Sequence, residues 1–575
     1  MVAVKSPHSG DLPMRRQNSM LAPFDSQSAR GEPMAKRIVI VGGVAGGMSA
    51  ATRLRRLDES AEIVVFERGP FVSFANCGLP YHIGGEIDDR AKLIVQTPKR
   101  LREVFNLDIR ANTEVLSIQP QAKTVTTATG IEPYDELILA TGTTAVMPDV
   151  PGIGLPGRFT LRTIPDLDAI LAWIETQQAK TALVLGGGYI GLEAAEQLHR
   201  RGLKVTIVEK NAQVLTPLDP EMASHVHAEL KKHGVAVKLQ NPAVSFDETG
   251  ATLQSGERIS ADIVVIGVGV KPNTALAKAA GLTIGASGGI FVDPRLRTSD
   301  PHIWAVGDAI EVTHGATFTP AVIPLAGPAN RQGRIVADNI CGLNSQYRGT
   351  MGTAVVRVFD LVAACTGANE TLLRKVGINF EAIHLHPNSH AGYYPGAKSL
   401  ALKILFAPEN GRLLGAQAVG EDGVDKRIDV LATALYGGMT IDDLAELELA
   451  YAPPFGSAKD PINLAGMAAQ NLLCGLVRVA QWYDVPRLLA SGAVIVDVRE
   501  PAERDGGVIP GSQNIPLGEL RARLEELPKD REILAHCASG QRSYNACRIL
   551  MQHGYKCWNL TGSYKTWKAA QGVSE

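Results

Sequence analysis

Two of the seven cysteines stand where sulfur chemistry is expected. Cys77 lies in the stretch Phe71 to Tyr81, which reads Phe-Val-Ser-Phe-Ala-Asn-Cys-Gly-Leu-Pro-Tyr. Positions 72 and 82 are Val and His, so no second cysteine stands five residues to either side. A lone redox cysteine cycles between its thiolate and a mixed disulfide, a persulfide or a sulfenic acid. We therefore expect its sulfur partner to come from outside the chain. The plainer alternative is an inert, buried thiol.

The second cysteine, Cys537, opens the loop Cys537-Ala-Ser-Gly-Gln-Arg542 between an apolar strand and a helical pattern. The backbone N–H groups of this loop and the Arg542 guanidinium would surround the sulfur. Such a nest lowers the pKa of the thiol and stabilises a persulfide or a bound oxyanion. A phosphatase-like loop is the alternative, but it needs a longer loop and an aspartic general acid, and no clear acid is found.

A glycine turn must position the first cysteine. The apolar strand 36–41 enters Gly42-Gly-Val-Ala-Gly-Gly47, a helical pattern follows, and a second strand, 62–67, ends in an acid. This order is typical of a dinucleotide-binding βαβ unit, in which the glycines let a pyrophosphate approach the helix and the acid binds a ribose. The middle glycine of the fingerprint is replaced by Val44. The predicted contacts are Gly42, Gly43, Ala45, Gly46, Gly47, Glu67 and Arg68.

A second turn, Gly186-Gly-Gly-Tyr-Ile-Gly191, has the complete GxGxxG fingerprint. Its second strand, 204–209, also ends in an acid, which favours NADH because it would repel a 2′-phosphate. The neighbouring Lys210 leaves some tolerance for NADPH. Segment 261–269 would close this unit and approach the nicotinamide. The predicted contacts are Gly186, Gly188, Tyr189, Ile190, Gly191, Glu209 and Gly267.

Two further segments make a family resemblance specific. The strand and turn 134–142 and the strand 303–308 resemble the other FAD-contacting motifs of the pyridine nucleotide-disulfide oxidoreductases. The resemblance implies that Asp308 binds the ribityl chain of FAD and that the helix opening near Ala326 faces the flavin pyrimidine edge, where its dipole stabilises charge. It also assigns Ala140, Thr141 and Gly142 to the cofactor.

The stretch 73–81 resembles the single-cysteine branch of this family, which includes coenzyme A-disulfide reductases, persulfide reductases and NADH oxidases or peroxidases. Segments 390–396 and 451–463 resemble the dimerisation domain of the coenzyme A-disulfide reductases. In that group, two tyrosines from the partner subunit reach the active-site sulfur, so a homodimer is expected. Tyr394 and Tyr451 are the matching candidates, with Tyr393 left open, and a phenol would protonate the leaving thiolate. Candidate coenzyme A contacts are Arg53, Arg56, Ser73 and Asn76.

The C-terminal segments 493–500, 511–516 and 533–543 resemble a rhodanese domain, although Val508 stands where that family often has histidine. The expected fold is α/β, with two nested Rossmann-like nucleotide-binding domains, an α+β dimerisation domain and an α/β rhodanese domain. The expected boundaries are a disordered leader at 1–33, an FAD domain at 34–149 and 271–344, an NADH domain at 150–270, a dimerisation domain at 345–467, a linker at 468–480 and a rhodanese domain at 481–575.

Composition narrows the class of partner. A formal net charge of −2 with 20% charged residues gives no field that would attract nucleic acid or anionic membrane. No apolar run reaches the roughly 18 to 20 residues that a spanning helix needs. Seven cysteines without paired spacings are typical of reduced thiols, so we expect the cytoplasm. No metal site is expected.

These patterns predict a flavoprotein that uses FAD and NADH to reduce coenzyme A persulfide, polysulfide or coenzyme A disulfide at Cys77. Cys537 would accept or deliver sulfane sulfur. Two alternatives remain: an NADH oxidase or peroxidase that works through a sulfenic acid at Cys77, and a non-enzymatic redox sensor with the rhodanese domain as a docking module.

Overall fold

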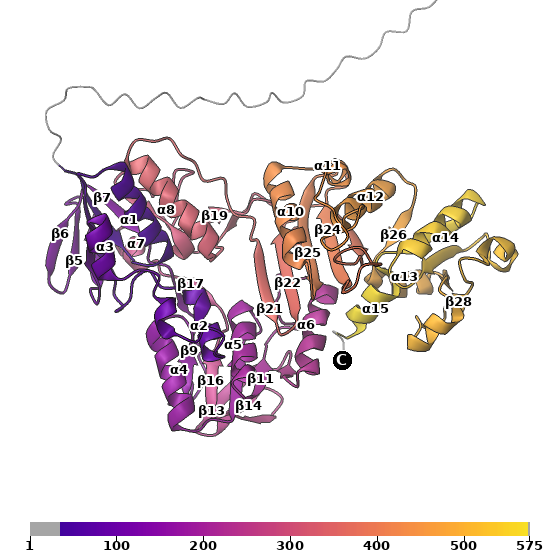
Figure 1. Cartoon of the computed structure of the whole chain (residues 1–575), viewed down its shortest axis with the longest axis horizontal. Coiled ribbons are helices and arrows are strands. Elements are labelled where there is room, and N and C mark those ends of the chain that lie inside the picture. Colours follow the sequence, from indigo (N-terminus) through magenta and orange to yellow (C-terminus); the bar gives the residue numbers. More distant parts are fainter. Residues whose placement is uncertain (1–34, 573–575) are drawn as a thin grey trace, which may run out of the picture.

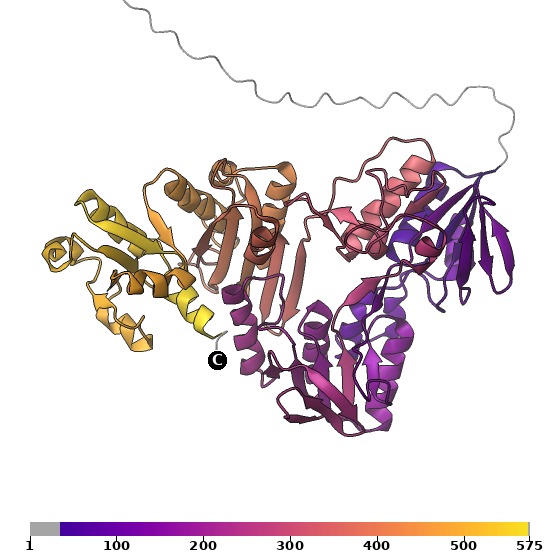
Figure 2. The same ribbon diagram turned by 180° about the vertical axis from the view of Figure 1, so that it is seen from behind.

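The computed structural model describes residues 35–572, so the leader predicted at 1–33 lies outside the described residues. The predicted α/β fold is confirmed: the chain forms four domains, each built around a five-stranded sheet. We number them along the chain, the second being inserted within the first. The first and fourth domains lie at opposite ends of the molecule, as the views from both sides show (Figure 1, Figure 2).

The first domain is built on the parallel sheet β18-β7-β1-β2-β3. Its central strand β1 is buried from Ile38 to Val41, as expected when both faces of a parallel sheet are covered. Helices α1 and α8 pack together so closely that a Cβ at Gly333 would lie 2.4 Å from the Gly46 carbonyl oxygen. The elements are β1 Arg37–Val41, α1 Ala45–Leu57, β2 Glu62–Phe66, α2 Leu79–Ile83, α3 Pro98–Phe105, β3 Asp108–Arg110, β4 Val115–Gln119, β5 Thr124–Thr127, β6 Gly130–Pro133, β7 Glu136–Leu139, α7 Ala275–Ala279, β18 Ile303–Ala305 and α8 Ala326–Ile340.

The second domain has the parallel sheet β12-β11-β10-β16-β9. The chain leaves the first domain through β8 and returns through β17, and these two strands pair antiparallel as a two-stranded ribbon. This ribbon therefore marks where one nucleotide fold is inserted in the other. The elements are β8 Thr143–Ala145, β9 Arg158–Thr160, α4 Ile164–Thr176, β10 Thr181–Leu185, α5 Tyr189–Arg200, β11 Lys204–Val208, α6 Pro220–Lys232, β12 Ala236–Lys238, β13 Ala243–Asp247, β14 Gly250–Leu253, β15 Arg258–Ser260, β16 Ile263–Ile266 and β17 Val270–Pro272.

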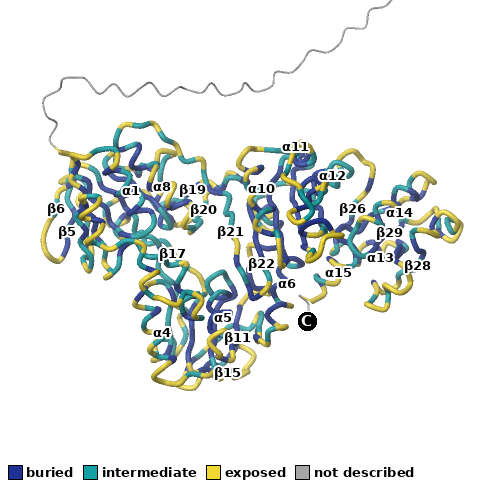
Figure 3. Tube along the Cα trace, in the orientation of Figure 1, coloured by how far each residue is buried: buried dark blue, intermediate teal, exposed yellow. Residues whose placement is uncertain are grey.

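The third domain is an antiparallel sheet, β21-β22-β25-β24-β23, joined to the first domain through the short pair of β19 and β20. Every residue of β24 and β25 is buried, so helices and neighbouring domains cover both faces (Figure 3). The elements are β19 Val312–Thr313, β20 Pro320–Ala321, β21 Ala354–Val358, β22 Leu361–Gly367, α9 Glu370–Val376, β23 Glu381–Leu385, β24 Leu400–Phe406, β25 Leu413–Gly420, α10 Val424–Gly437, α11 Ile441–Glu446 and α12 Pro461–Leu473.

The fourth domain has the parallel sheet β26-β30-β29-β27-β28. The expectation of a linker at 468–480 is wrong, because α12 continues to Leu473 and β26 already pairs with β30 of this sheet. The reason is that Leu472 packs against the core of the third domain while Val477 is buried in the core of the fourth. The elements are β26 Arg478–Ala480, α13 Val485–Ala490, β27 Val494–Asp497, β28 Gln513–Asn514, β29 Glu532–His536, α14 Gln541–Gln552, β30 Lys556–Leu560 and α15 Ser563–Gln571.

A buried ionic cluster joins the second, third and fourth domains. The Lys403 ammonium, fully buried on β24, contacts the carboxylates of Asp219, Glu221 and Glu370 at 2.6–2.7 Å. From the fourth domain, the Trp482 indole N–H donates to Glu221 at 3.1 Å. The fourth domain is therefore held against the second and third by buried polar contacts, in addition to its covalent connection. None of the described helices is long and apolar enough to cross a membrane.

Candidate active site

One cavity of about 1250 Å³ brings the two nucleotide folds and Cys77 together. Cys77 lies just before α2 and is exposed to this cavity. Residues of both glycine turns and of the further predicted cofactor motifs line the same space. The predicted site residues in its wall are Ala45, Asn76, Cys77, Gly188, Tyr189, Ile190, Gly267, Asp308 and Ala326.

The first glycine turn has no room for a side chain at Gly42 or Gly47. Gly42 has φ 109°, and a Cβ there would lie 2.1 Å from the Ala140 carbonyl oxygen. A Cβ at Gly47 would lie 1.9 Å from the Gly42 carbonyl oxygen. Val44, the departure from the fingerprint, has a negative φ of −111°, so this position does not need the left-handed backbone that favours glycine. No side chain caps α1, so its first N–H groups are free to bind a pyrophosphate.

The second turn repeats this geometry. A Cβ at Gly186 would lie 2.4 Å from the Gly267 carbonyl oxygen, and a Cβ at Gly191 would lie 2.0 Å from the Gly186 carbonyl oxygen. Gly188 differs, since a Cβ there would meet nothing within 4 Å of chain and would project into the cavity. The close-packed glycines therefore shape the turn, while Gly188 leaves space for a ligand.

The two predicted ribose-binding acids stand one residue beyond their strands. Glu67 accepts hydrogen bonds from the backbone N–H groups of Gly43 and Gly69 at 2.9 and 2.8 Å. Glu209 accepts from Gly187 N–H and from Asn211 in the same way. Each carboxylate is thereby held against its glycine turn and keeps lone pairs for a ribose hydroxyl. The residues present fit FAD in the first domain and NAD(P)H in the second.

The remaining predicted cofactor residues lie at the junction of the two nucleotide folds. Thr141 Oγ1 donates to the Asn273 carbonyl at 2.7 Å, next to the ribbon of β8 and β17. Gly142 follows with φ 63°. Arg68 is exposed, and its charge faces that of Arg162, a cavity residue that lies near Asp308. Burial raises the pKa of Asp308, and Arg162 partly offsets this rise.

The surroundings of Cys77 favour its protonated form. Burial raises the pKa of the thiol, and the negative charges of Glu193 and Asp308 raise it further. The neighbouring Asn76 side-chain oxygen lies 3.6 Å from the sulfur and accepts a hydrogen bond from the thiol. A thiolate at Cys77 therefore depends on the charges that line the cavity.

Glu193 is a cavity residue that the sequence analysis did not select. Burial raises its pKa to about 7, although the Tyr81 hydroxyl donates a hydrogen bond to it at 3.1 Å. Residues four apart share a helix face, so Glu193 stands one turn after Tyr189 on α5. This spacing of four residues from a predicted contact is the signal by which the sequence could have identified Glu193. Tyr189 itself contacts the Cys365 sulfur at 3.6 Å through its hydroxyl.

The three candidate tyrosines gather on an exposed part of the third domain. The Tyr393 and Tyr451 hydroxyls lie 3.1 Å apart, and Tyr394 packs edge-on against His390. Their exposed fractions are 76%, 48% and 42% for Tyr393, Tyr451 and Tyr394. None of them is in the described wall of this chain's Cys77 cavity. If they act on a redox cysteine, they do so in another subunit.

The candidate coenzyme A residues are divided by the structure. Asn76 lines the cavity, and Ser73 is held beside the first turn by a 2.8 Å bond from its N–H to the Gly43 carbonyl. Arg53 and Arg56 lie on the last turns of α1, outside the cavity wall. Arg53 pairs with Asp338 at 2.8 Å, and Arg56 is exposed. The coenzyme A contacts of these two arginines therefore stay predictions, and they would require a part of the ligand that extends out of the cavity.

Cys537 lies in a nest of donors in the fourth domain. The Gly540 N–H donates to its sulfur at 3.1 Å, and the Ser543 hydroxyl donates at 3.5 Å. Burial alone would raise the pKa of Cys537, but the hydrogen bonds from Ser543, Gly540 and Ser539 outweigh it and lower the pKa. Arg542 stands at the edge of the nest, where two 2.6 Å bonds pair it with Glu503.

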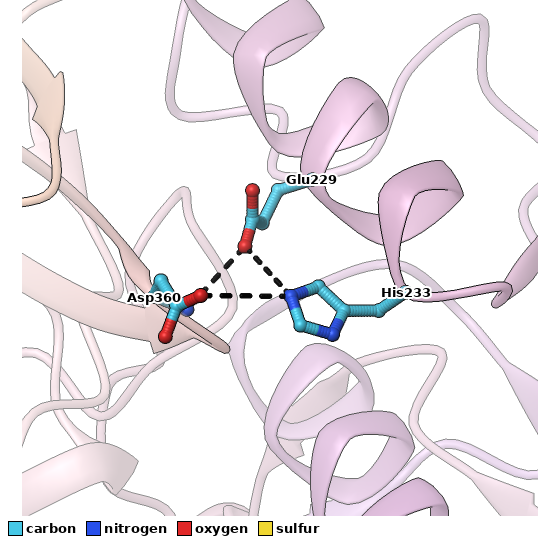
Figure 4. Close-up of side chains that lie close together, drawn as sticks. All are labelled: Glu229, His233 and Asp360. Atoms are coloured by element: carbon cyan, nitrogen blue, oxygen red, sulfur yellow. Dashed lines mark hydrogen bonds and ion pairs between the residues drawn. The ribbon is translucent and has the colours of Figure 1, made fainter.

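Two groups of side chains resemble metal ligand sets, but a lysine ammonium already contacts the carboxylates of each. Figure 4 shows the first, which consists of Glu229 on α6, His233 directly after this helix and Asp360 between β21 and β22. The Lys232 ammonium lies 3.2 Å from Glu229 and 3.5 Å from Asp360. The second is the cluster around Lys403 described above. Both sets act as contacts between domains.

Comparisons with known proteins agree with this geometry. The family model of the pyridine nucleotide-disulphide oxidoreductases matches residues 36–333, and the model of their dimerisation domain matches residues 353–460. A rhodanese-like domain matches residues 482–570. A coenzyme A disulfide reductase of Staphylococcus haemolyticus (strain JCSC1435) is 37% identical over 444 residues, which are 76% of this chain and 100% of that protein.

Two solved structures resemble almost the whole chain. The crystal structure of reduced Bacillus anthracis CoADR-RHD has a TM-score of 0.92 at 48% identity and covers 93% of this chain and 98% of its own. The NAD-dependent persulfide reductase from A. fulgidus has a TM-score of 0.87 at 37% identity and covers 92% of this chain and 100% of its own. This chain therefore belongs to the pyridine nucleotide-disulphide oxidoreductases, with their dimerisation domain and a rhodanese-like domain at its C-terminal end.

Proposed function

We propose that the protein reduces the S–S bond of a coenzyme A persulfide or coenzyme A disulfide at Cys77, at the expense of NADH. The observation that carries this proposal is that Cys77 shares one cavity with residues of both nucleotide turns, Ala45 and Gly188. Proteins of this family use FAD and NAD(P)H. The similarity to a coenzyme A disulfide reductase and to a persulfide reductase supports the substrate class.

Each group in the cavity has a role in this scheme. The Cys77 thiolate attacks the sulfur on the coenzyme A side of a persulfide, the S–S bond breaks, and hydrosulfide leaves as a Cys77–coenzyme A mixed disulfide forms. FAD, when bound, supplies the two electrons from NADH that return both sulfurs to thiols. Asp308 and the N-terminus of α8 would hold the flavin, and Gly188 and Glu209 would hold NADH.

The exposed tyrosines suggest how the site is completed. In a homodimer, Tyr394 and Tyr451 of the partner subunit would reach the sulfur at Cys77 and protonate the leaving thiolate. Their exposure on the dimerisation domain, away from their own chain's cavity, supports this arrangement. The free cysteines of the described chain fit a reducing compartment, and we infer the cytoplasm.

Replacing Cys77 with serine tests the proposal. Cys77→Ser should abolish NADH-dependent release of sulfide from coenzyme A persulfide, while NADH still bleaches the flavin absorbance. Cys474→Ser, at an exposed cysteine after α12, is the matched control and should keep full activity. Unchanged turnover in Cys77→Ser would refute the assignment.

The same assay separates the alternatives. Oxygen or peroxide consumption that matches NADH use would favour an oxidase or peroxidase working through a sulfenic acid at Cys77. No steady-state NADH oxidation with any S–S substrate, oxygen or peroxide would favour a redox sensor.

A further inference from the structure

A second large cavity, of about 1490 Å³, lies where the second, third and fourth domains meet. Its walls come from α6 and β12, from β24 and β25, and from α15 with the start of the Cys537 loop. It shares no described wall residue with the Cys77 cavity. Figures 1 and 2 show α15 beside α6 at this junction. Cys77 lines only the first cavity, whereas Ala538, the residue after Cys537, lines the second.

The wall of this second cavity carries unpaired positive charge. Lys231 at the end of α6 and Lys565 and Lys568 on α15 have no carboxylate within 4 Å among the described residues. The acids of the wall are already neutralised, since Glu421 pairs with Lys398 at 2.7 Å and Glu503 pairs with Arg542. The cavity therefore attracts anions.

The other charged groups of the wall add little to this balance. Lys238 pairs with Glu257 at 2.6 Å, and Arg499 pairs with Asp497 at 2.7 Å. Burial lowers the pKa of His225, so it stands as a neutral hydrogen-bonding group at neutral pH. The three lysines are thus the cations that remain for a ligand.

The Cys537 loop forms part of the same wall. Ala538 lines the cavity, and its carbonyl accepts a hydrogen bond from the Lys565 N–H at 3.0 Å. The Cys537 carbonyl accepts from the Tyr564 N–H at 3.1 Å. Glu503, at the cavity edge, holds Arg542 of the loop by two 2.6 Å bonds. A ligand bound on the lysines would therefore lie against the loop that carries the reactive sulfur.

Buried contacts hold the third and fourth domains together at this cavity. The His384 N–H donates to the Thr561 hydroxyl at 2.8 Å, and the Gln481 amide donates to the Ala382 carbonyl at 2.9 Å. His386, in the cavity wall, lies 2.8 Å from the Thr566 hydroxyl on α15. Because each contact joins the third domain to the fourth, the cavity is a fixed feature of the fold.

We propose that this cavity binds a phosphate-bearing thiol persulfide of the coenzyme A type and presents its sulfane sulfur to Cys537. The Cys537 thiolate would attack the outer sulfur, the S–S bond would break, and the coenzyme A thiolate would leave and take up a proton. One sulfur atom moves and no net oxidation occurs, so no further reductant is needed. The inference rests on the proposed function, because it assigns the substrate of that reaction to the rhodanese-like domain.

The dimensions and chemistry of the cavity favour such a ligand over a small inorganic anion. A pocket for an organic ligand typically measures about 300–1,000 Å³, and this cavity exceeds that range. Its wall also offers apolar surface from Leu361 and Val419 and the ring of Tyr564. The several phosphates of such a ligand could pair with all three lysines, whereas thiosulfate would fill only a small part of the cavity.

The experiment measures sulfur transfer to Cys537 in the full-length Cys77→Ser flavoprotein, in which the flavin site cannot turn over. The variant carries Lys231→Gln, Lys565→Gln and Lys568→Gln together. Its control carries Lys180→Gln, Lys278→Gln and Lys375→Gln at exposed lysines outside the cavity. The mass of the Cys537 peptide reports the rate at which one sulfur atom is gained from coenzyme A persulfide, glutathione persulfide or thiosulfate.

We expect the cavity variant to lose at least about tenfold in rate with coenzyme A persulfide and less than about twofold with glutathione persulfide, because only the former carries the phosphates. The control should match the parent, and adding 3′-phospho-ADP should inhibit both the parent and the control but not the cavity variant. An equal loss with thiosulfate would overturn the ligand class, and an unchanged rate with coenzyme A persulfide would overturn the site. Either failure leaves NADH-dependent reduction at Cys77 intact in the wild-type chain, so it is distinct from a failure of the proposed function.

Discussion

At the scale of single residues, the two cysteines have opposite electrostatics. Cys77 is exposed to its cavity, yet burial of its surroundings and two nearby carboxylates raise its pKa. Cys537 is only 1% exposed, yet the donors of its nest lower its pKa. Exposure alone therefore does not indicate which thiol is ionised. The Cys537 nest stabilises the anion by itself, whereas the ionisation of Cys77 responds to Glu193.

The charge of Glu193 can be tested directly. Glu193 is anionic above its pKa of about 7, and its negative charge raises the pKa of Cys77. Glu193→Gln should therefore lower the pKa of Cys77 and move the onset of its alkylation to lower pH. Glu175→Gln, at an exposed acid, serves as the control. The pH dependence of Cys77 alkylation in the flavoprotein measures the shift, and identical profiles for the two variants would contradict this account.

At the scale of elements, the glycine turns combine two different requirements. Gly191 is needed because α5 starts against the Gly186 carbonyl, and no side chain fits there. Gly188 is needed only to leave space for the ligand in the cavity. Its φ of −80° suits any residue, and a Cβ there would meet no atom of the chain within 4 Å. A fingerprint therefore contains residues that serve the fold and residues that serve the ligand.

These two glycines make a matched pair of variants. Gly188→Ala should raise the KM for NADH severalfold with an unchanged melting temperature, because its methyl group projects into the cavity. Gly191→Ala should destabilise the protein by about 1–3 kcal/mol through overpacking against backbone. Thermal unfolding and NADH kinetics of both variants separate the effects. A stable Gly191→Ala protein with normal unfolding would contradict this division.

At the scale of the whole molecule, buried polar contacts decide how the domains are joined. The cluster around Lys403 draws Asp219 and Glu221 from the second domain to Glu370 and Lys403 of the third. The fourth domain joins it, because the Tyr483 hydroxyl donates to Glu370 at 3.3 Å. A buried charge is costly unless it is paired. Removing Lys403, the single cation, would leave three carboxylates unpaired in the interior.

Lys403→Met should therefore destabilise the protein by about 3–5 kcal/mol, the typical cost of breaking a buried ion pair. It should also loosen the fourth domain, which limited proteolysis would detect as earlier cleavage near residues 474–477, between α12 and β26. Lys398→Met removes an exposed pair with Glu421 and should change stability by less than about 1 kcal/mol. Equal stability of the two variants would refute the role of the cluster.

The α/β class, the two glycine turns and the acids after β2 and β11 could be predicted from the sequence, because they depend on residues within about 30 positions of one another. Tertiary structure alone decided the rest. It paired Arg542 with Glu503, replaced the expected linker with packed helix and strand, and raised the pKa of Cys77 through burial and the charges of Glu193 and Asp308. It also placed Lys231 and Lys565 in the wall of one cavity. These features arise from contacts between segments that are far apart in the sequence, so a local sequence pattern cannot predict them.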